Sequence, residues 1–355
     1  MLDFNQEGGT KDIKQITLLR LSALGDIVLV VPLVRVLQRS FPDADIVWVT
    51  SQLGYELLKG MAGVRFIVVP KPKTLKKWWQ ARKILRREQS DVLLVLQASM
   101  SSNLLCPLIS APRKIGFDSV RGRDGHGFVV NERLTYKDEH FVDAYLSFAA
   151  KLGVSNLGDA KWDLPISSDD YNWAKAIVSS STPWLAVCIT ASKQERNWPV
   201  ERYVAVIDYV MQHGINVVIV GSACLAEQKV VAEVVSRCGQ EPVNLAGKTT
   251  VSQLVALLAQ VDSLLSPDTG PSHLARAVNT PVVGLYAVAT PKLSGPYQAQ
   301  EHCIDRYELA ISKYGAAKRA TFHSRVHDDR AMSLIAVSDV ILVLKKLFAA
   351  DLVGV

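Results

Sequence analysis

The chain has 355 residues, 49% of them hydrophobic, which is enough for two domains that each have a buried core. No apolar run reaches the roughly 20 residues of a transmembrane helix, and the first ten residues lack the basic and apolar regions of a secretory signal. The five cysteines lie far apart without C-x-x-C spacing, which indicates buried thiols in a reducing compartment and makes a zinc site unexpected.

The net charge of +6 is unevenly distributed along the chain. Residues 71–123 contain twelve Lys and Arg against three acidic residues, a local charge of +9. The rest of the chain is therefore slightly acidic. A basic region confined to one part of one half predicts an anionic partner there.

The first strong pattern is a strand, a turn and a helix. Residues 16–21 form an apolar run, S-A-L-G-D follows as a turn, and residues 27–41 have helical apolar spacing. A second strand is predicted at 46–49, which completes a βαβ unit. Asp26 falls at the carboxyl end of the first strand, where it either caps the helix or acts as a general base. The dinucleotide fingerprint G-x-G-x-x-G is absent.

Residues 75–87 are predicted to form a helix in which basic residues surround paired tryptophans. Lys76 and Lys77 precede Trp78 and Trp79, a mixture typical of a membrane interface. An ordinary packing helix with solvated lysines is the alternative. No accompanying motif supports nucleic-acid binding, so nucleic acid is not an expected partner.

The loop 118–127, D-S-V-R-G-R-D-G-H-G, is rich in glycine and basic residues. Arg121, Arg123 and His126 are candidates for gripping an acidic acceptor. The alternative is a mobile, solvated loop. Residues 140–151 then have the spacing of an amphipathic helix.

Residues 158–170 have the composition of a linker, and a second α/β domain begins with the apolar strand 185–190. The loop after this strand carries hydroxyl and cationic side chains, namely Thr190, Ser192, Lys193 and Arg196. Such groups between a strand and a helix suit a diphosphate. The alternative is a charged, solvated turn.

The segment 262–291 carries the densest chemistry: a strand, the turn S-P-D-T-G-P, a helix and another strand. Thr269, Gly270 and His273 lie where the helix begins, so free N–H groups and the positive end of the helix dipole favour a phosphate there. Asp268 either caps the helix or grips a sugar hydroxyl. Residues 305–330 are weakly patterned, and 332–347 are predicted to form a final helix.

Two of these turns together resemble bacterial glycosyltransferase family nine, the ADP-heptose:lipopolysaccharide heptosyltransferases. The motifs are L-R-L-S-A-L-G-D-I-V-L-V-V-P and S-P-D-T-G-P-S-H-L-A-R-A-V-N-T-P-V-V-G-L-Y, with S-K-Q-E-R-N-W and N-L-A-G-K-T between them. The resemblance implies an α/β GT-B fold with two Rossmann-like domains, 1–165 and 166–331, facing a central cleft. It also implies that a helix in 332–355 crosses back to the first domain.

The family further implies an inverting, metal-independent transfer of heptose from ADP-heptose to inner-core Kdo, with no cofactor. The sequence looks most like the heptosyltransferase I branch, which acts on a phosphorylated Kdo acceptor. The expected partners are therefore ADP-heptose and Kdo-lipid A. We expect the protein in the cytoplasm, attached peripherally to the inner membrane through its basic region.

The matching motifs assign roles residue by residue. Asp26 resembles the general base, and Asp268 would hold the heptose. The donor diphosphate would be held by Arg196 together with Thr269, Gly270 and His273. Expected donor contacts are Thr190, Ser192, Lys193, Arg196, Lys248, Thr269, Gly270 and His273. Expected acceptor contacts are Ser22, Lys76, Lys77, Arg121 and Arg123.

The sequence departs from the family at two places. The loop I-T-A-S-K-Q-E-R lacks the paired threonines of many relatives, and Lys248 stands where a methionine is common. The alternatives are a family-nine transferase with another donor or acceptor, a nucleotide-sugar epimerase of the same fold, and a nucleotide-binding module without turnover.

Overall fold

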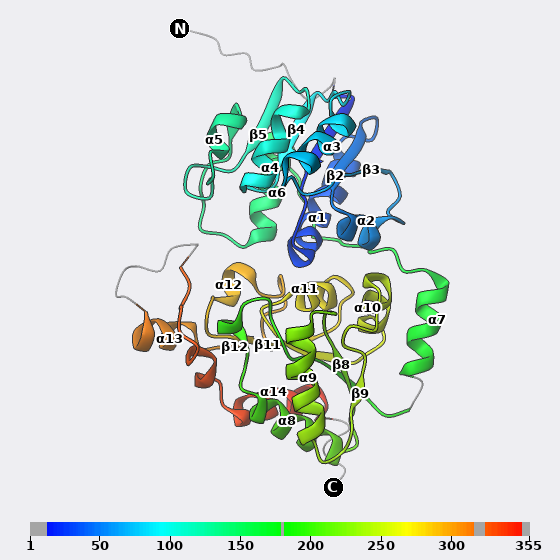
Figure 1. Ribbon diagram of the computed structural model, residues 1–355, viewed down its shortest axis with the longest axis vertical. Coiled ribbons are helices and arrows are strands. Elements are labelled where there is room, and N and C mark those ends of the chain that lie inside the picture. The colour runs from blue at the N-terminus through cyan, green and yellow to red at the C-terminus, as the bar shows by residue number, and fades with distance from the viewer. Residues whose placement is uncertain (1–12, 179–180, 316–323, 350–355) are drawn as a thin grey trace. The chain divides into compact units, whose positions relative to one another are not determined.

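The computed structural model describes residues 13–178, 181–315 and 324–349. The chain divides into two compact units, Met1–Pro165 and Ile166–Val355 (Figure 1). Each unit is a parallel β-sheet with helices packed on it. None of the helices in the described ranges is both long and apolar enough to cross a bilayer.

The sheet of the first unit has the order β3-β2-β1-β4-β5-β6, and all its pairs are parallel. Its strands are β1 (Gln15–Leu19), β2 (Asp45–Thr50), β3 (Val64–Val68), β4 (Val92–Val95), β5 (Arg113–Gly116) and β6 (Glu132–Arg133). The order reverses direction between β1 and β4, which is the arrangement of a Rossmann-like sheet.

The helices of the first unit connect these strands, and α1 lies at the centre of their packing. They are α1 (Leu24–Ser40), α2 (Gln52–Leu58), α3 (Leu75–Leu85), α4 (Met100–Leu105), α5 (His126–Val129) and α6 (Phe141–Lys151). Eleven of the seventeen residues of α1 are buried, because its apolar side chains face both the sheet and α6. This packing fixes the position of the first turn of α1, which carries Asp26.

The sheet of the second unit repeats the same order as β12-β11-β10-β7-β8-β9, again with parallel pairs. Its strands are β7 (Trp184–Cys188), β8 (Asn216–Val220), β9 (Val243–Asn244), β10 (Ser263–Pro267), β11 (Val282–Tyr286) and β12 (Ile304–Asp305). The central strands β7, β10 and β11 are buried along their whole length, as expected where helices cover both faces of a parallel sheet.

The second unit contains more helices than the sequence patterns predicted. They are α7 (Ser168–Ile177), α8 (Val200–Gln212), α9 (Leu225–Arg237), α10 (Val251–Leu258), α11 (Gly270–Ala277), α12 (Pro291–Ser294), α13 (Tyr307–Tyr314) and α14 (Val337–Leu347). The segment 305–330, expected to be irregular, contains α13. The end of the expected linker is also helical, since Ser167 Oγ accepts a hydrogen bond from Asp170 N at 3.1 Å and starts α7.

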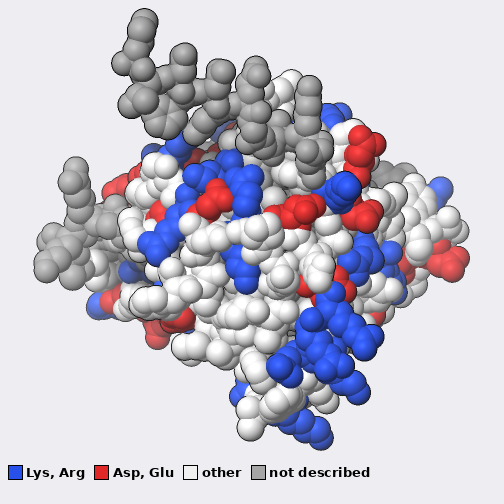
Figure 2. Space-filling view, turned by 90° about the horizontal axis from the view of Figure 1, so that it is seen from above, with Lys and Arg blue, Asp and Glu red and all other residues white. Residues whose placement is uncertain are grey.

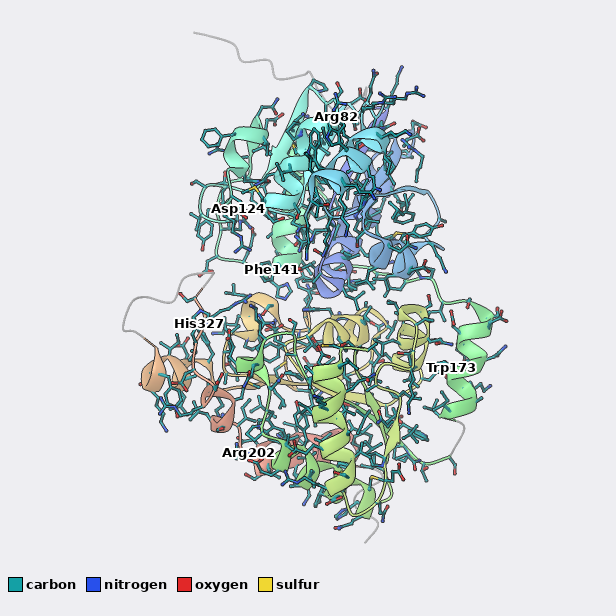
Figure 3. All side chains as sticks on the ribbon, in the orientation of Figure 1. Arg82, Asp124, Phe141, Trp173, Arg202 and His327 are labelled. Carbon is teal, nitrogen blue, oxygen red and sulfur yellow. The ribbon has the colours of Figure 1, made fainter. Side chains whose placement is uncertain are left out.

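The final helix is shorter than expected and packs within the second unit. A 3₁₀ turn, Ala331–Leu334, precedes α14. Arg202 (Figure 3) donates hydrogen bonds to the carbonyls of Ser333 and Ile335, and Trp198 Nε1 donates to Ile335 O at 3.0 Å. The buried side chains of α14 join the core of this unit. Contact of this helix with the first domain stays a prediction.

Candidate active site

Both sheets place chemically active side chains at the point where the strand order reverses. In sheets of this kind ligands bind beyond the carboxyl ends of the strands, at that point. In the first unit the turn after β1 leads to Asp26. In the second unit, the loop after β7 carries Arg196 and the turn after β10 carries Asp268. Each unit therefore presents a candidate site where its topology favours one.

Asp26 is held by a cation that the sequence analysis did not single out. Arg20 Nη2 lies 2.6 Å from Asp26 Oδ2, and the backbone N–H of Ala23 donates to the same oxygen at 2.9 Å. Arg20 also donates to the carbonyl of Leu96, which follows β4. The Arg20 side chain is only 9% exposed, whereas that of Asp26 is 39% exposed. One carboxylate oxygen is thus fixed, and the carboxylate remains accessible.

The alternative hypothesis, in which Asp26 is the N-cap of its helix, is wrong. The N-cap is Ala23, and Asp26 is the third helical residue, where its carboxylate binds the N-cap N–H. Arg20 could have been singled out from the sequence, because it is a charged residue inside the buried run I-T-L-L-R-L. A buried cation beside a strand end needs an acidic partner.

In the second unit Arg196 pairs with Asp268. Arg196 Nη1 lies 3.2 Å from Asp268 Oδ2 and donates to Asp268 O at 3.1 Å. Both side chains are nearly buried, at 14% and 12% exposure. The pair adjoins the first turn of α11, where Thr269 rather than Asp268 is the N-cap. The structure thus groups a cation, a carboxylate and a helix N-terminus, as the sequence predicted, but Asp268 is not the cap.

The remaining expected donor contacts differ in how available they are. Thr190 is buried, and its hydroxyl donates to Glu227 Oε2 at 3.1 Å, so it is already engaged. Ser192 and Lys193 are exposed on the same loop. Lys248 is exposed as well and donates to Asn244 O at 2.8 Å. Gly270 is half-buried and His273 is buried, both in the first turn of α11.

Glu227 is a further polar residue at this edge that the sequence analysis missed. It lies in the first turn of α9 and accepts hydrogen bonds from Thr190 and from Ser222 Oγ, the latter at 2.7 Å. The available signal was its position: like Asp26 and Asp268, it follows the carboxyl end of a parallel strand by a few residues.

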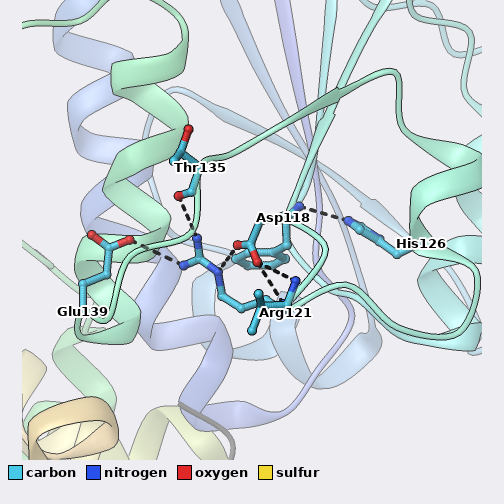
Figure 4. Close-up of polar contacts among 7 residues, drawn as sticks. Asp118, Arg121, His126, Thr135 and Glu139 are labelled. Carbon is cyan, nitrogen blue, oxygen red and sulfur yellow. Dashed lines mark hydrogen bonds and ion pairs between the residues drawn. The ribbon is translucent and has the colours of Figure 1, made fainter. Parts of the chain in front are cut away.

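The expectation that Arg121 binds the acceptor is contradicted by its surroundings (Figure 4). Its side chain is 3% exposed, and its guanidinium donates to Asp118, Glu139 and the carbonyl of Thr135 at 2.5, 3.5 and 3.5 Å. It also lies over the ring of Phe117 at 5.2 Å. Arg121 therefore holds the loop 118–127 against the segment 135–139 that precedes α6. Arg123, in contrast, is exposed.

His126 is likewise structural. It is 1% exposed, its Nε2 accepts a hydrogen bond from Phe117 N at 3.0 Å, and its Nδ1 is 3.0 Å from Asn103 Oδ1. An acceptor at Nε2 and an amide oxygen at Nδ1 require the neutral ring with the proton on Nδ1. Burial, together with Arg133, lowers the pKa of His126 to about 4. The ring is therefore uncharged at neutral pH and cannot attract an anion.

Lys76 and Lys77 are exposed on α3, beside apolar side chains that also face solvent. Leu75 and Trp79 are 73% and 53% exposed, whereas Leu85 at the end of the same helix is buried. Arg82 (Figure 3) lies over the ring of Trp79 at 5.1 Å. Figure 2 shows Lys and Arg side chains gathered on part of one face of the molecule. The exposed part of α3 is therefore both basic and apolar.

Within the described residues, no group of three or more His, Cys, Asp and Glu side chains is placed to hold a metal ion. The charged groups at each candidate site form an ion pair within their own unit, Arg20 with Asp26 and Arg196 with Asp268.

Residues 78–319 match the family described as Glycosyltransferase family 9 (heptosyltransferase). The sequence is also 33% identical over 341 residues to the lipopolysaccharide core heptosyltransferase OpsX of Haemophilus influenzae, covering 95% of this chain and 98% of that protein. The chain belongs to glycosyltransferase family 9. It is accordingly an enzyme of glycosyl transfer.

Solved structures agree with the fold of this family 9 enzyme. A family 9 glycosyltransferase from Veillonella parvula superposes with a TM-score of 0.79 at 23% identity, covering 96% of this chain and 99% of that one. The Escherichia coli heptosyltransferase WaaC with ADP gives 0.70 at 18% identity, covering 94% and 99%. Two Rossmann-like sheets in one chain with these neighbours make the fold GT-B.

Proposed function

We propose that this family 9 enzyme transfers heptose from ADP-heptose to Kdo of the lipopolysaccharide inner core. The observation that carries the proposal is the Arg196–Asp268 pair at the N-terminus of α11, where the strand order of the second unit reverses. A cation, free helix N–H groups and a sugar-binding carboxylate are the groups that a nucleoside diphosphate sugar requires. Family membership and the related heptosyltransferases support the choice of heptose.

In the second unit, Arg196 and the first turn of α11 would hold the diphosphate through Thr269, Gly270 and His273. Asp268 would accept hydrogen bonds from the heptose hydroxyls. The related WaaC structure contains ADP, which supports adenosine diphosphate as the donor's nucleotide. Ser192, Lys193 and Lys248 are exposed, so they are free to reach the phosphates or the ribose.

The reaction is a single displacement at the anomeric carbon. The acceptor oxygen of Kdo forms a bond to that carbon, the bond to the β-phosphate oxygen breaks, and ADP departs with the electron pair. Asp26 takes the proton of the acceptor hydroxyl as the general base. Attack opposite the leaving group inverts the configuration. Arg196 and the dipole of α11 offset the charge on the departing diphosphate, so the step is metal-independent and needs no cofactor.

The geometry around Asp26 suits this role. Arg20 and the Ala23 N–H both bind Oδ2, and in the described part of the chain no hydrogen bond to Oδ1 is present. The carboxylate is therefore fixed in orientation with one oxygen available to a proton. Ser22 is half-buried in the turn that precedes α1 and is a candidate acceptor contact.

The acceptor is a phosphorylated Kdo-lipid A at the cytoplasmic face of the inner membrane, and we propose peripheral attachment through the first unit. Seven large apolar side chains between 75 and 128 are exposed: Leu75, Trp79, Ile84, Met100, Leu104, Val120 and Phe128. They lie on α3, α4 and α5 and the loop before α5, among Lys76, Lys77 and Arg123. Apolar groups mixed with cations suit an anionic bilayer.

The test is ADP release by the purified protein with ADP-heptose, with and without phosphorylated Kdo-lipid A, and with the lipid analysed by mass. Acceptor-dependent ADP release with the addition of one heptose supports the proposal. Donor binding without transfer to this lipid would redirect it to another acceptor. Conversion of the donor without any acceptor would favour an epimerase, and the absence of donor binding would overturn the ADP-heptose assignment.

A further inference from the structure

The hydroxyl of Tyr286 is buried without a hydrogen-bond partner in the described structure, next to the Arg196–Asp268 pair. Tyr286 is 1% exposed, and its Oη is among the few buried polar atoms that lack a partner. Arg196 Nε is another such atom. Buried polar groups are almost always paired, and leaving one unpaired costs about 1–3 kcal/mol. Two unpaired atoms beside one ion pair therefore require an explanation.

The fold places Tyr286 beside Asp268 through the register of two strands. Pro267 of β10 pairs with Leu285 of β11, so the residues that follow them, Asp268 and Tyr286, continue side by side. Gly284 makes room for the Tyr286 ring, since a Cβ there would lie 2.6 Å from Cε2 of that ring. The strand register and Gly284 together therefore determine where the Tyr286 ring lies.

Tyr286, Arg196 and Asp268 line one small pocket together with Met332. About 10 Å³ of it is open to a water molecule, which is roughly the space that one water needs. Burial, followed by the charge of Asp268, raises the pKa of Tyr286 well above its usual value. The hydroxyl therefore remains protonated at neutral pH and can act as a donor.

Another hydroxyl, that of Ser272, lies near Tyr286 and acts to lower its pKa. Its hydrogen bond is donated to Thr269 O at 2.7 Å. No hydrogen bond of normal geometry joins Ser272 to the Tyr286 hydroxyl. Among the residues that line its pocket, Asp268 is the one whose side chain is a carboxylate and can accept a hydrogen bond from the Tyr286 hydroxyl.

We propose that Tyr286 is a positioning residue that donates a hydrogen bond to Asp268 when the donor diphosphate draws Arg196 away from it. This rests on the proposed function, in which Arg196 binds the diphosphate. Asp268 is nearly buried, so losing Arg196, the cation with which it pairs in the described structure, leaves a buried charge that needs a replacement partner. The Tyr286 hydroxyl, unpaired in the free protein, supplies that replacement and keeps Asp268 oriented toward the sugar.

The test is the binding of ADP to the full chain by calorimetry, together with the Tm of the free protein. Tyr286→Phe removes only the hydroxyl. Because this hydroxyl is unpaired in the free protein, the Tm is expected to stay the same or rise, while ADP binds about tenfold more weakly, the effect of one hydrogen bond to a charged group. A structural role would lower the Tm instead, and that result overturns the proposal.

A double-mutant cycle tests whether Asp268 is the group to which the Tyr286 hydroxyl donates. In Asp268→Asn, which has no buried charge to compensate, adding Tyr286→Phe is expected to change ADP affinity less than twofold. An equal loss in both backgrounds overturns the proposal, as does normal ADP binding by Tyr286→Phe. The matched control is Tyr203→Phe: Tyr203 is also fully buried, but its hydroxyl donates to Cys188 O at 3.4 Å. That variant is expected to lower the Tm and leave ADP affinity unchanged.

The same experiment separates this inference from the proposed function. If the wild-type protein does not bind ADP, the donor assignment and the role of Tyr286 both fail. If the wild-type protein binds ADP and Tyr286→Phe binds it equally well, only the role of Tyr286 fails. In turnover assays the variant is expected to show a raised KM for ADP-heptose with a smaller change in kcat, because the hydroxyl acts through Asp268 and not on the reacting atoms.

Discussion

Arg20 and Asp26 form an ion pair at 2.6 Å in which the cation is nearly buried and the carboxylate is not. The pair joins the end of β1 to the first turn of α1. Since Arg20 also binds the carbonyl that follows β4, it links the two strands between which the sheet order reverses. The candidate base is therefore oriented by the centre of the fold and not by a loose loop.

Asp26→Asn keeps the shape of the side chain but removes its ability to take a proton. A positioned general base contributes about 10²–10⁴-fold, so turnover is expected to fall at least ~10²-fold. ADP affinity should be unchanged, because the nucleotide is assigned to the second unit. Steady-state ADP release and calorimetry measure the two quantities, with exposed Asp43→Asn as the control. Near-normal turnover would remove Asp26 from the role of base.

Arg20→Met tests whether Arg20 acts through Asp26. Without the guanidinium, the Asp26 carboxylate is no longer held in one orientation. We therefore expect kcat to fall about tenfold. In the Asp26→Asn background the same change should slow the enzyme no further, because there is no base left to position. Independent, multiplicative losses would show instead that Arg20 acts on the substrate directly.

Arg121→Met separates structure from acceptor binding. Removing this guanidinium leaves the carboxylates of Asp118 and Glu139 without their buried partner. Breaking such a network costs about 3–5 kcal/mol, which urea unfolding measures. Arg123→Met, two residues away and exposed, is the matched control and should change stability by less than about 1 kcal/mol. Equal stability of the two variants would contradict the structural role of Arg121.

The pKa of His126, lowered to about 4 by burial, predicts a pH dependence of stability. In the unfolded state His126 takes up a proton near pH 6.5, whereas in the folded state it does so only near pH 4. Its contribution to the free energy of unfolding is therefore complete above pH 6.5 and is lost as the pH falls toward 4. The lost free energy is on the order of 3 kcal/mol. Unfolding in urea across this range should show the loss in wild type and in exposed His327→Gln, but not in His126→Gln. If the free energy of unfolding changed with pH in the same way in all three proteins, His126 would not be the cause of the loss.

The sequence predicted the fold class and the strand–turn–helix units because apolar runs and turn residues are local signals. Asp26, Arg196 and Asp268 were found because each follows a buried strand. Pairings between distant parts of the chain were not predictable in this way. Arg121 was predicted to contact the acceptor from its glycine-rich loop, yet it is buried and pairs with Asp118 and with Glu139, which lies eighteen residues further along the chain. Tyr286 carried no signal of its own within the predicted strand, and only the register of β10 and β11 places it beside Asp268.

The exposed basic and apolar surface of α3 predicts reversible binding to anionic bilayers. Each Lys near such a surface contributes about 1 kcal/mol, so Lys76→Glu with Lys77→Glu should weaken vesicle binding by at least ~30-fold. Added salt should weaken it too, because these charges are exposed and screened. Trp79→Ser is expected to weaken binding at high salt as well, since the loss there is apolar contact.

Sedimentation with vesicles of phosphatidylglycerol and phosphatidylethanolamine measures this binding. The matched control reverses two exposed lysines of the second unit, Lys175→Glu and Lys229→Glu, which change net charge by the same amount. If α3 is the contact surface, only the α3 variant loses binding. Equal loss in both would indicate attraction to net charge alone, and binding that is insensitive to salt and to Lys76 and Lys77 would exclude attachment through this surface.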